Sequence, residues 1–205
     1  MKYIITTLLI LLVAVNAFGQ SKITILSYQM SIPDQRLENY IDETSFRGVG
    51  FDGRWFVSDE TPITLGLALA WHVFDQKTDE MIVFDGGALS GMQNRYVNSF
   101  PIMLTGHWYI GNKDKLWISI GGGIGTYYII QRLEVGVHSL EESNWHFGAY
   151  PEIGLQIPLS EADFFVSGKY NYAFDAGDSV QGVALQDRNY YNYWTISVGL
   201  AYQGW

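Results

Sequence analysis

Apolar positions alternate with small or polar positions along most of the chain. In residues 116–130 the even positions are mainly Leu, Ile and Tyr, whereas the odd positions are mainly Gly, Ser and Tyr. Residues 62–73 repeat the pattern, with Leu and Trp on one face and Thr, Gly, Ala and His on the other. The last segment, 193–202, does so again. A period of two is typical of β-strands whose two faces meet different surroundings.

This alternation predicts eight strands, at about 22–32, 45–57, 62–74, 95–110, 116–131, 145–158, 164–174 and 190–203. Long connections are expected at 33–44, 75–94, 132–144 and 175–189, and short ones at 58–61, 111–115 and 159–163. Alternating long and short connections are typical of an up-and-down antiparallel meander. The first long connection contains a candidate for a short helical turn near 34–41.

Composition agrees with a strand-rich protein. The 205 residues include 16% aromatic side chains and 22 glycines, and only 16% are charged. A typical soluble domain has roughly 25% charged residues. The formal net charge of −9 and the absence of any Lys/Arg-rich run argue against nucleic acid as a partner. The chain has no cysteine, which excludes disulfides, thiolate metal sites and a cysteine nucleophile.

The first 19 residues are expected to be a secretory signal peptide. Lys2 supplies a positive charge, residues 4–15 form a short apolar segment, and Ala17 and Gly19 precede a cleavage site before Gln20. The apolar segment is shorter than the roughly 20 residues that a spanning helix needs. Residues 20–205 then form a single barrel domain.

Two kinds of barrel fit eight alternating strands: a soluble lipocalin-like barrel with an apolar interior, and a membrane barrel with an apolar exterior. The second face is rich in Gly, Ala, Ser and Thr, which suit a narrow interior better than a water-facing surface. Aromatic residues on the apolar face lie near strand ends, as in an interfacial girdle. They are Trp55, Trp108 and Tyr202 near the short turns, and Trp71, Trp145 and Trp194 near the long connections. We therefore expect an all-β, eight-stranded antiparallel up-and-down transmembrane β-barrel.

The signal peptide, the eight strands, the loop alternation and the glycine-rich strand at 121–128 resemble the small bacterial outer-membrane β-barrel family of the OmpA-membrane-domain, OmpX and OmpW type. This resemblance implies location in a Gram-negative outer membrane, contact with outer-membrane lipid and lipopolysaccharide, and insertion by the barrel-assembly machinery. Members often end on an aromatic residue in phase with the outward face. Trp205 is out of phase here, so Tyr202 is the expected in-phase terminal aromatic.

Charged residues on the small-residue face are the most informative candidates for a site. They are Asp52, Arg54, Glu152 and Lys169. A hairpin about 159–163 places Lys169 opposite Glu152, and Asp52 and Arg54 lie at a similar height. Because an unpaired buried charge is costly, these residues are predicted to form an ion network in the lumen. A structural plug is favoured over a gate.

The remaining candidates carry weaker signals. His72, His107, His138 and His146 match no short metal-binding motif, although His72 and His146 share a face, and neither a metal nor a cofactor is expected. The glycines at 121–125 lie within a strand, so close packing explains them better than phosphate binding does. Acidic residues in the long connections are interpreted as ordinary solvated side chains.

The favoured function is a non-enzymatic surface barrel, either structural or a scaffold that binds an extracellular partner through its loops. Three alternatives remain at this point. The first is a minor porin or a passage for small apolar molecules. The second is a lipid-modifying enzyme, for which His138, Ser139 and Glu141 nominally supply the groups. The third is a soluble periplasmic carrier.

Overall fold

The computed structural model describes residues 21–38, 40–58, 60–79, 82–84, 87–89, 91–112, 114–136, 138–174 and 190–204. The expected signal peptide, the connection at 175–189 and Trp205 lie outside these residues.

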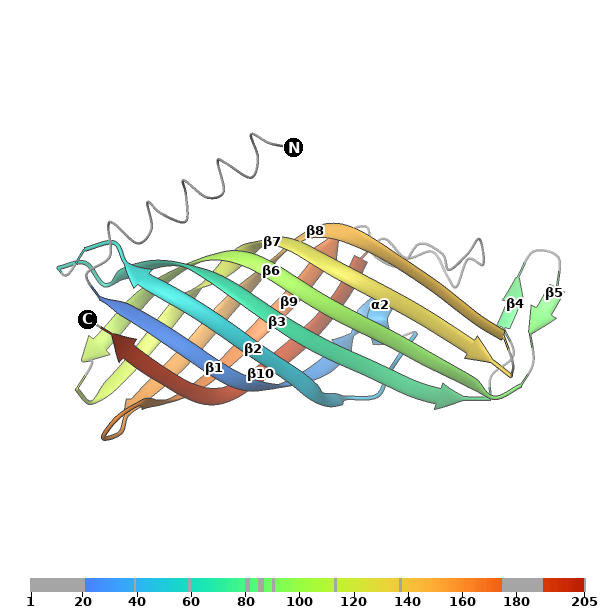
Figure 1. The fold of residues 1–205 in the computed structure, drawn as a ribbon, viewed down its shortest axis with the longest axis horizontal. Helices are drawn as coiled ribbons and strands as arrows, with labels where there is room; N and C mark the ends of the chain where they lie inside the picture. The colour runs from blue at the N-terminus through green and yellow to red at the C-terminus, as the bar shows by residue number, and fades with distance from the viewer. Residues whose placement is uncertain are drawn as a thin grey trace.

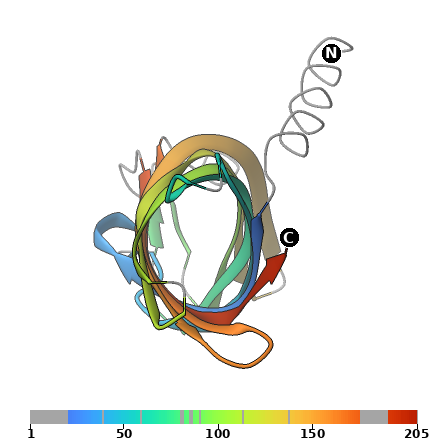
Figure 2. The same cartoon turned by 90° about the vertical axis from the view of Figure 1, so that its left-hand side faces the viewer.

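Eight antiparallel strands close into a barrel in the order β1-β10-β9-β8-β7-β6-β3-β2 (Figure 1). The strands are β1 Lys22–Asp34, β2 Ser45–Phe56, β3 Ile63–Thr78, β6 Gln93–Asn112, β7 Leu116–Val135, β8 His138–Pro158, β9 Asp163–Phe174 and β10 Tyr190–Gly204. Pairing of β1 with β10 completes the ring, which Figure 2 shows end-on. The predicted fold is confirmed.

The predicted long connection at 132–144 is wrong. β7 continues to Val135 and β8 begins at His138, so that Gly136 and residue 137 alone connect them. The charged residues of this segment suggested a solvated loop. In the structure, Arg132 and Glu141 instead form an ion pair of 2.5 Å across the hairpin. The hydrogen bond to Glu141 raises the pKa of Arg132 above its ordinary value. Charged residues on the outer face are compatible with strand where the strand extends past its shorter neighbours.

The predicted connections at 75–94 and 33–44 also contain structure. The first includes the ends of β3 and β6 and a small hairpin of β4 (Ile82–Phe84) and β5 (Gly87–Leu89). The second contains α2 (Gln35–Glu38), at the predicted helical turn. Among the described residues, no helix is both long enough and apolar enough to cross a bilayer.

Strand length divides the wall of the barrel into a long side and a short side. β6 and β7 have 20 residues each and β8 has 21, whereas β2 and β9 have 12. Crossing a bilayer takes about 9–11 residues. The ends of the long strands therefore extend past the short strands as a projecting sheet, at the right of Figure 1. This sheet consists of residues 73–78, 93–98, 129–135 and 138–144.

The polarity of the barrel is the reverse of that of a soluble protein. Leu65, Leu104 and Ile124 point outward and are 57%, 56% and 59% exposed. The inner face holds buried Gln, Ser, Thr and charged side chains. Inner glycines make room for large neighbours: a Cβ at Gly123 would lie 2.9 Å from the Tyr150 ring. Close packing thus accounts for the glycine-rich strand.

Candidate functional site in the barrel interior

Arg54 lies at the centre of a group of charged side chains inside the barrel. Asp52 and Arg54 are two positions apart on β2, so both face inward. The Arg54 Nε and Nη2 atoms donate to Asp52 Oδ2 at 2.8 and 2.6 Å. Nη2 also donates to Glu152 Oε1 at 2.9 Å, and Nη1 donates to the Tyr109 hydroxyl at 3.1 Å. Arg54 therefore connects β2 with β6 and β8 across the lumen.

Glu152 collects the remaining contacts. Strand pairing sets Glu152 beside Lys169, and the Lys169 Nζ lies 3.5 Å from Glu152 Oε2. His107 Nε2 lies 3.2 Å from the same oxygen. We call the five residues Asp52, Arg54, His107, Glu152 and Lys169 the ion layer. The structure thus brings all four predicted charges together and adds His107, whose inward position on β6 follows from the same alternation.

The ion layer is buried but balanced in charge. Each of its residues is at most 8% exposed. Two carboxylates face one guanidinium and one ammonium, so the formal charges cancel when His107 is neutral. Aromatic rings add cation–π contacts, with Arg54 5.6 Å from the Phe165 centroid and Lys169 5.0 Å from that of Tyr150. Mutual pairing offsets the cost of removing these charges from water.

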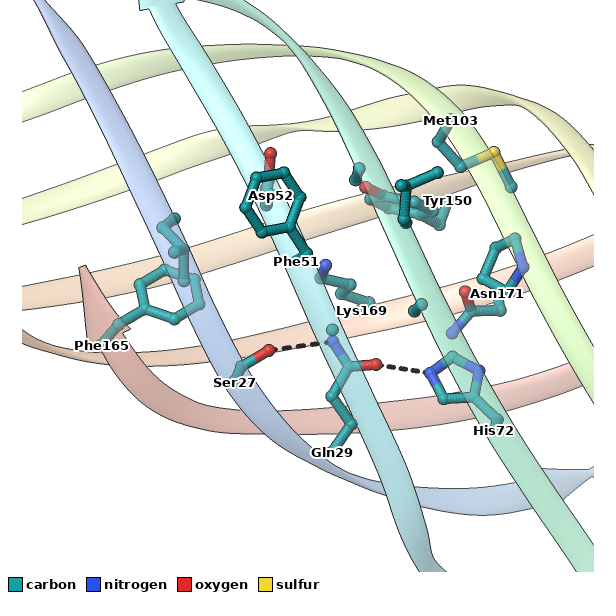
Figure 3. Close-up of a pocket in the computed structure, with 16 residues that line it drawn as sticks. Ser27, Gln29, Phe51, Asp52, His72, Met103, Tyr150, Phe165, Lys169 and Asn171 are labelled. Carbon is teal, nitrogen blue, oxygen red and sulfur yellow. Dashed lines mark hydrogen bonds between the residues drawn. The ribbon is translucent and has the colours of Figure 1, made fainter. Parts of the chain in front are cut away.

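Little open space remains beside the ion layer. A cavity of about 20 Å³ lies among residues that include Gln29, Asp52, His72 and Lys169 (Figure 3). That volume accommodates roughly one water molecule. The arrangement therefore blocks the middle of the lumen.

A second polar layer surrounds His72. Its Nδ1 lies 2.9 Å from the Tyr193 hydroxyl and its Nε2 lies 2.5 Å from Gln29 Oε1. The Tyr193 hydroxyl also contacts Ser99 Oγ at 3.1 Å. Both ring nitrogens of His72 are thus engaged by protein groups, and the part of the chain that the structure describes holds no cluster of three potential metal ligands. The side chain of His138 lies outside the description.

The mouth at the short-turn end is open and aromatic. A cavity of about 460 Å³ there is lined by Phe56, Tyr109 and Trp117, among others. The Trp117 ring lies 5.7 Å from Phe56 and 4.7 Å from Tyr109. Tyr109 also binds Arg54 and so links the lining of this cavity to the ion layer. Sequence reasoning missed this aromatic group, although the alternation places Tyr109 on the same face as His107.

The expected girdle residues all lie on the outer face. Trp71, Trp108, Trp145, Trp194 and Tyr202 are exposed, whereas Trp55 is half-buried and lies over Gly53. Near the long-loop end the rings of Trp71, Phe100, Tyr128 and Trp145 follow one another at centroid distances of 5.8, 6.3 and 5.0 Å. Phe100 and Tyr128 were not predicted, although their outward positions follow from the alternation.

The sequence and the fold of the chain were compared with those of known proteins. No protein-family model matches the chain, and no curated protein sequence matches it. Neisserial surface protein A (NspA) has a TM-score of 0.51 at 12% identity, over 89% of this chain and 96% of that one. The attachment invasion locus protein Ail of Yersinia pestis, in complex with the heparin analogue sucrose octasulfate, has a TM-score of 0.47 at 13% identity, over 90% and 99%. The N-terminal β-barrel domain of Pseudomonas aeruginosa OprF has a TM-score of 0.43 at 13% identity, over 91% and 99%. The match to NspA, together with the closed eight-stranded ring, shows that the chain has the fold of the small bacterial outer-membrane barrels.

Proposed function

We propose that this protein is a non-enzymatic barrel of the bacterial outer membrane that serves as a surface scaffold. The observation that carries the proposal is the reversed polarity of the wall. Leu104, Ile124 and other large apolar side chains point outward, whereas Arg54 and Glu152 are buried inside. Apolar side chains exposed around a closed barrel are stable in lipid, where every backbone group is already paired. Export through the expected signal peptide agrees with this location.

The interior supports a scaffold better than it supports a porin or a soluble carrier. A porin needs a continuous aqueous path, but the ion layer and the His72 layer fill the lumen. A lipocalin-like carrier needs an apolar internal cavity, whereas the cavity beside the ion layer is only about 20 Å³. Since eight strands leave an interior about as wide as its own side chains, a closed lumen is the physical expectation.

The projecting sheet is the part that we assign to extracellular contacts. It extends the wall on the side opposite to the short turns, and both described chain ends lie at the short-turn end (Figure 1). Short turns are typical of the periplasmic side. We infer that the projecting sheet faces outward past the lipopolysaccharide, that the outer face contacts outer-membrane lipid, and that the barrel-assembly machinery inserts the chain.

Fractionation and heat-modifiability test the proposal. We expect the full-length protein in the outer-membrane fraction of a Gram-negative host, with a gel mobility that changes on boiling. Planar-bilayer recording of the purified protein should show no stable conductance. A detergent-free soluble protein in the periplasm would refute the membrane location, and a steady open channel would refute the scaffold in favour of a porin.

A further inference from the structure

The connection between β1 and β2 buries its apolar side chains. Leu37 and Ile41 are 0% exposed and Tyr40 is 2% exposed. The three positions are spaced i, i+3 and i+4, so one helical turn presents them on a single side. The amides of Tyr40 and Ile41 donate to the Leu37 carbonyl at 2.9 and 2.8 Å, which shapes that turn. A solvated surface loop would not bury three large apolar side chains.

This segment crosses the mouth at the other end of the barrel, opposite to the short turns, from the short side of the wall to the long side. α2 packs against β10 and β1, which are shorter than the strands of the long side. The following residues reach the projecting sheet, where Arg95 Nη1 donates to the Tyr40 carbonyl at 3.0 Å and the Tyr40 hydroxyl donates to the Arg132 carbonyl at 3.4 Å. The Arg95 guanidinium also lies 5.4 Å from the centre of the Tyr40 ring. The two sides of the mouth are thereby connected.

A third tie holds the end of the segment. The Asp42 amide donates to Gln76 Oε1 at 3.0 Å, and the Gln76 amide group donates back to the Asp42 carboxylate. Gln76 lies on β3, at the edge of the projecting sheet. Polar ties to β3, β6 and β7 therefore hold the segment on the long side of the barrel, in addition to its apolar contact.

The contact covers apolar side chains that line the mouth. Leu37, Tyr40 and Ile41 belong to one buried cluster with Phe74, Val97, Ile129, Tyr191 and Tyr193. These residues come from strands on both sides of the barrel. The lumen is therefore closed by apolar packing at the end opposite to the short turns, whereas its middle is closed by ion pairs.

We propose that residues 35–38 and 40–44 form a strap that holds the extracellular mouth of the barrel shut. The lumen is then closed at two separate levels of different chemistry, the strap and the ion layer. Release of the strap would expose an apolar surface at the mouth, while the contacts within the ion layer would persist. The extracellular location of this mouth rests on the proposed membrane orientation, whereas the contacts of the strap do not depend on it.

Cysteine labelling tests the strap, because the natural chain contains no cysteine and a single introduced thiol is unique. Ile129→Cys places the thiol beneath the strap, where the native side chain is 4% exposed. Glu43→Cys is the matched control, because Glu43 is an exposed residue of the strap itself. The probe is a membrane-impermeant maleimide applied to the purified, detergent-folded protein. We expect the thiol at position 129 to react more than about tenfold more slowly than the control.

Two strap variants complete the experiment. Leu37→Asp combined with Ile41→Asp expels the apolar contact, and Arg95→Met removes the tie to Tyr40 without adding a charge. Both should bring the reaction of Ile129→Cys to within a few-fold of the control, while the heat-dependent gel shift persists. Equal rates at the two thiols in the intact protein would overturn the strap. So would continued protection at position 129 in both variants.

The proposed function can fail separately. On intact cells, Glu43→Cys should react with the same probe. If it reacts only in the purified protein, the membrane orientation is wrong, whereas the strap is still judged by the rates in detergent.

Discussion

At the scale of single residues, Arg54 is the side chain on which the interior depends most. It binds Asp52, Glu152 and Tyr109 at the same time. Lys169 and His107, by contrast, each pair with Glu152 within the ion layer. Loss of Arg54 would remove the ion pair of Asp52 and one of those of Glu152, whereas loss of Lys169 would leave Glu152 with Arg54 and His107.

This asymmetry predicts a ranking of stabilities. Arg54→Met should lower the free energy of unfolding by on the order of 3–5 kcal/mol, the usual cost of breaking a buried ion pair. Lys169→Met should cost clearly less. Glu152→Gln combined with Lys169→Met should cost less than the sum of the single changes, because no unpaired charge remains. Urea unfolding in lipid vesicles measures these three variants and the single variant Glu152→Gln. Additivity at Glu152 and Lys169, or equal costs for the two cations, would contradict the geometry.

An inner glycine, Gly123, and an outer glycine, Gly168, provide a second prediction at this scale. A Cβ at Gly123 would lie 2.9 Å from Tyr150 Cζ and 3.1 Å from Met103 Cβ, whereas one at Gly168 would meet nothing within 4 Å. Gly123→Ala should therefore destabilise the barrel by about 1–3 kcal/mol through overpacking. Gly168→Ala is the control and should change stability by less than about 1 kcal/mol. The same unfolding assay applies, and similar costs at both positions would show that the lumen tolerates a larger side chain.

At the scale of elements, the hairpin of β7 and β8 shows how a strand continues past its shorter neighbours in the wall. Val135 pairs with His138, and Gly136 has a φ of 60° in the turn between them. Leu133 and Val135 remain buried on the inner side of the projecting sheet, while Arg132 and Glu141 pair on its outer side. The hairpin is thus held by its turn, an apolar inner face and a surface ion pair.

The turn supplies the prediction for this element. A β-branched residue is strained at a positive φ, so Gly136→Val should cost on the order of 1–2 kcal/mol locally. Gly136→Asn is the control, because asparagine tolerates that conformation. Hydrogen exchange at the Val135 and Leu140 amides should accelerate in the valine variant and not in the control. The heat-dependent gel shift should persist in both, and its loss would mean that the hairpin and the membrane-spanning wall unfold together.

At the scale of the whole molecule, the barrel has a closed interior between two unlike ends. The short-turn end has an open aromatic cavity of about 460 Å³, and the other end has the projecting sheet and the strap. The ion layer lies between them. Such a molecule presents distinct surfaces to the two sides of a membrane without connecting them by a water-filled path.

Single thiols at the two ends test this orientation. Ser139→Cys lies in the projecting sheet and Lys115→Cys in a short turn, and both native residues are exposed. On intact cells an impermeant maleimide should label Ser139→Cys, and it should label Lys115→Cys only after the outer membrane is opened. The reverse pattern would place the projecting sheet in the periplasm.

Much of the barrel could be predicted from sequence because strand alternation is a local property. Whether a side chain faces inward depends on its position along its own strand, so Arg54, Glu152 and the outward tryptophans could be assigned to faces without a structure. The pairing of Glu152 with Lys169 followed from a short turn, which sets the register of the hairpin. The fold class and the membrane-facing polarity were determined at this level.

Other features depend on distance in space and were decided only by the tertiary structure. Arg54 reaches Glu152 and Tyr109 because the closed ring is narrow enough for an extended guanidinium to cross it. The predicted start of β8 was also wrong, since charged residues remain in strand where the wall extends past the shorter strands. The strap is the clearest case. The spacing of Leu37, Tyr40 and Ile41 indicates a helical turn, but its burial required strands of unequal length to leave an apolar surface opposite that turn.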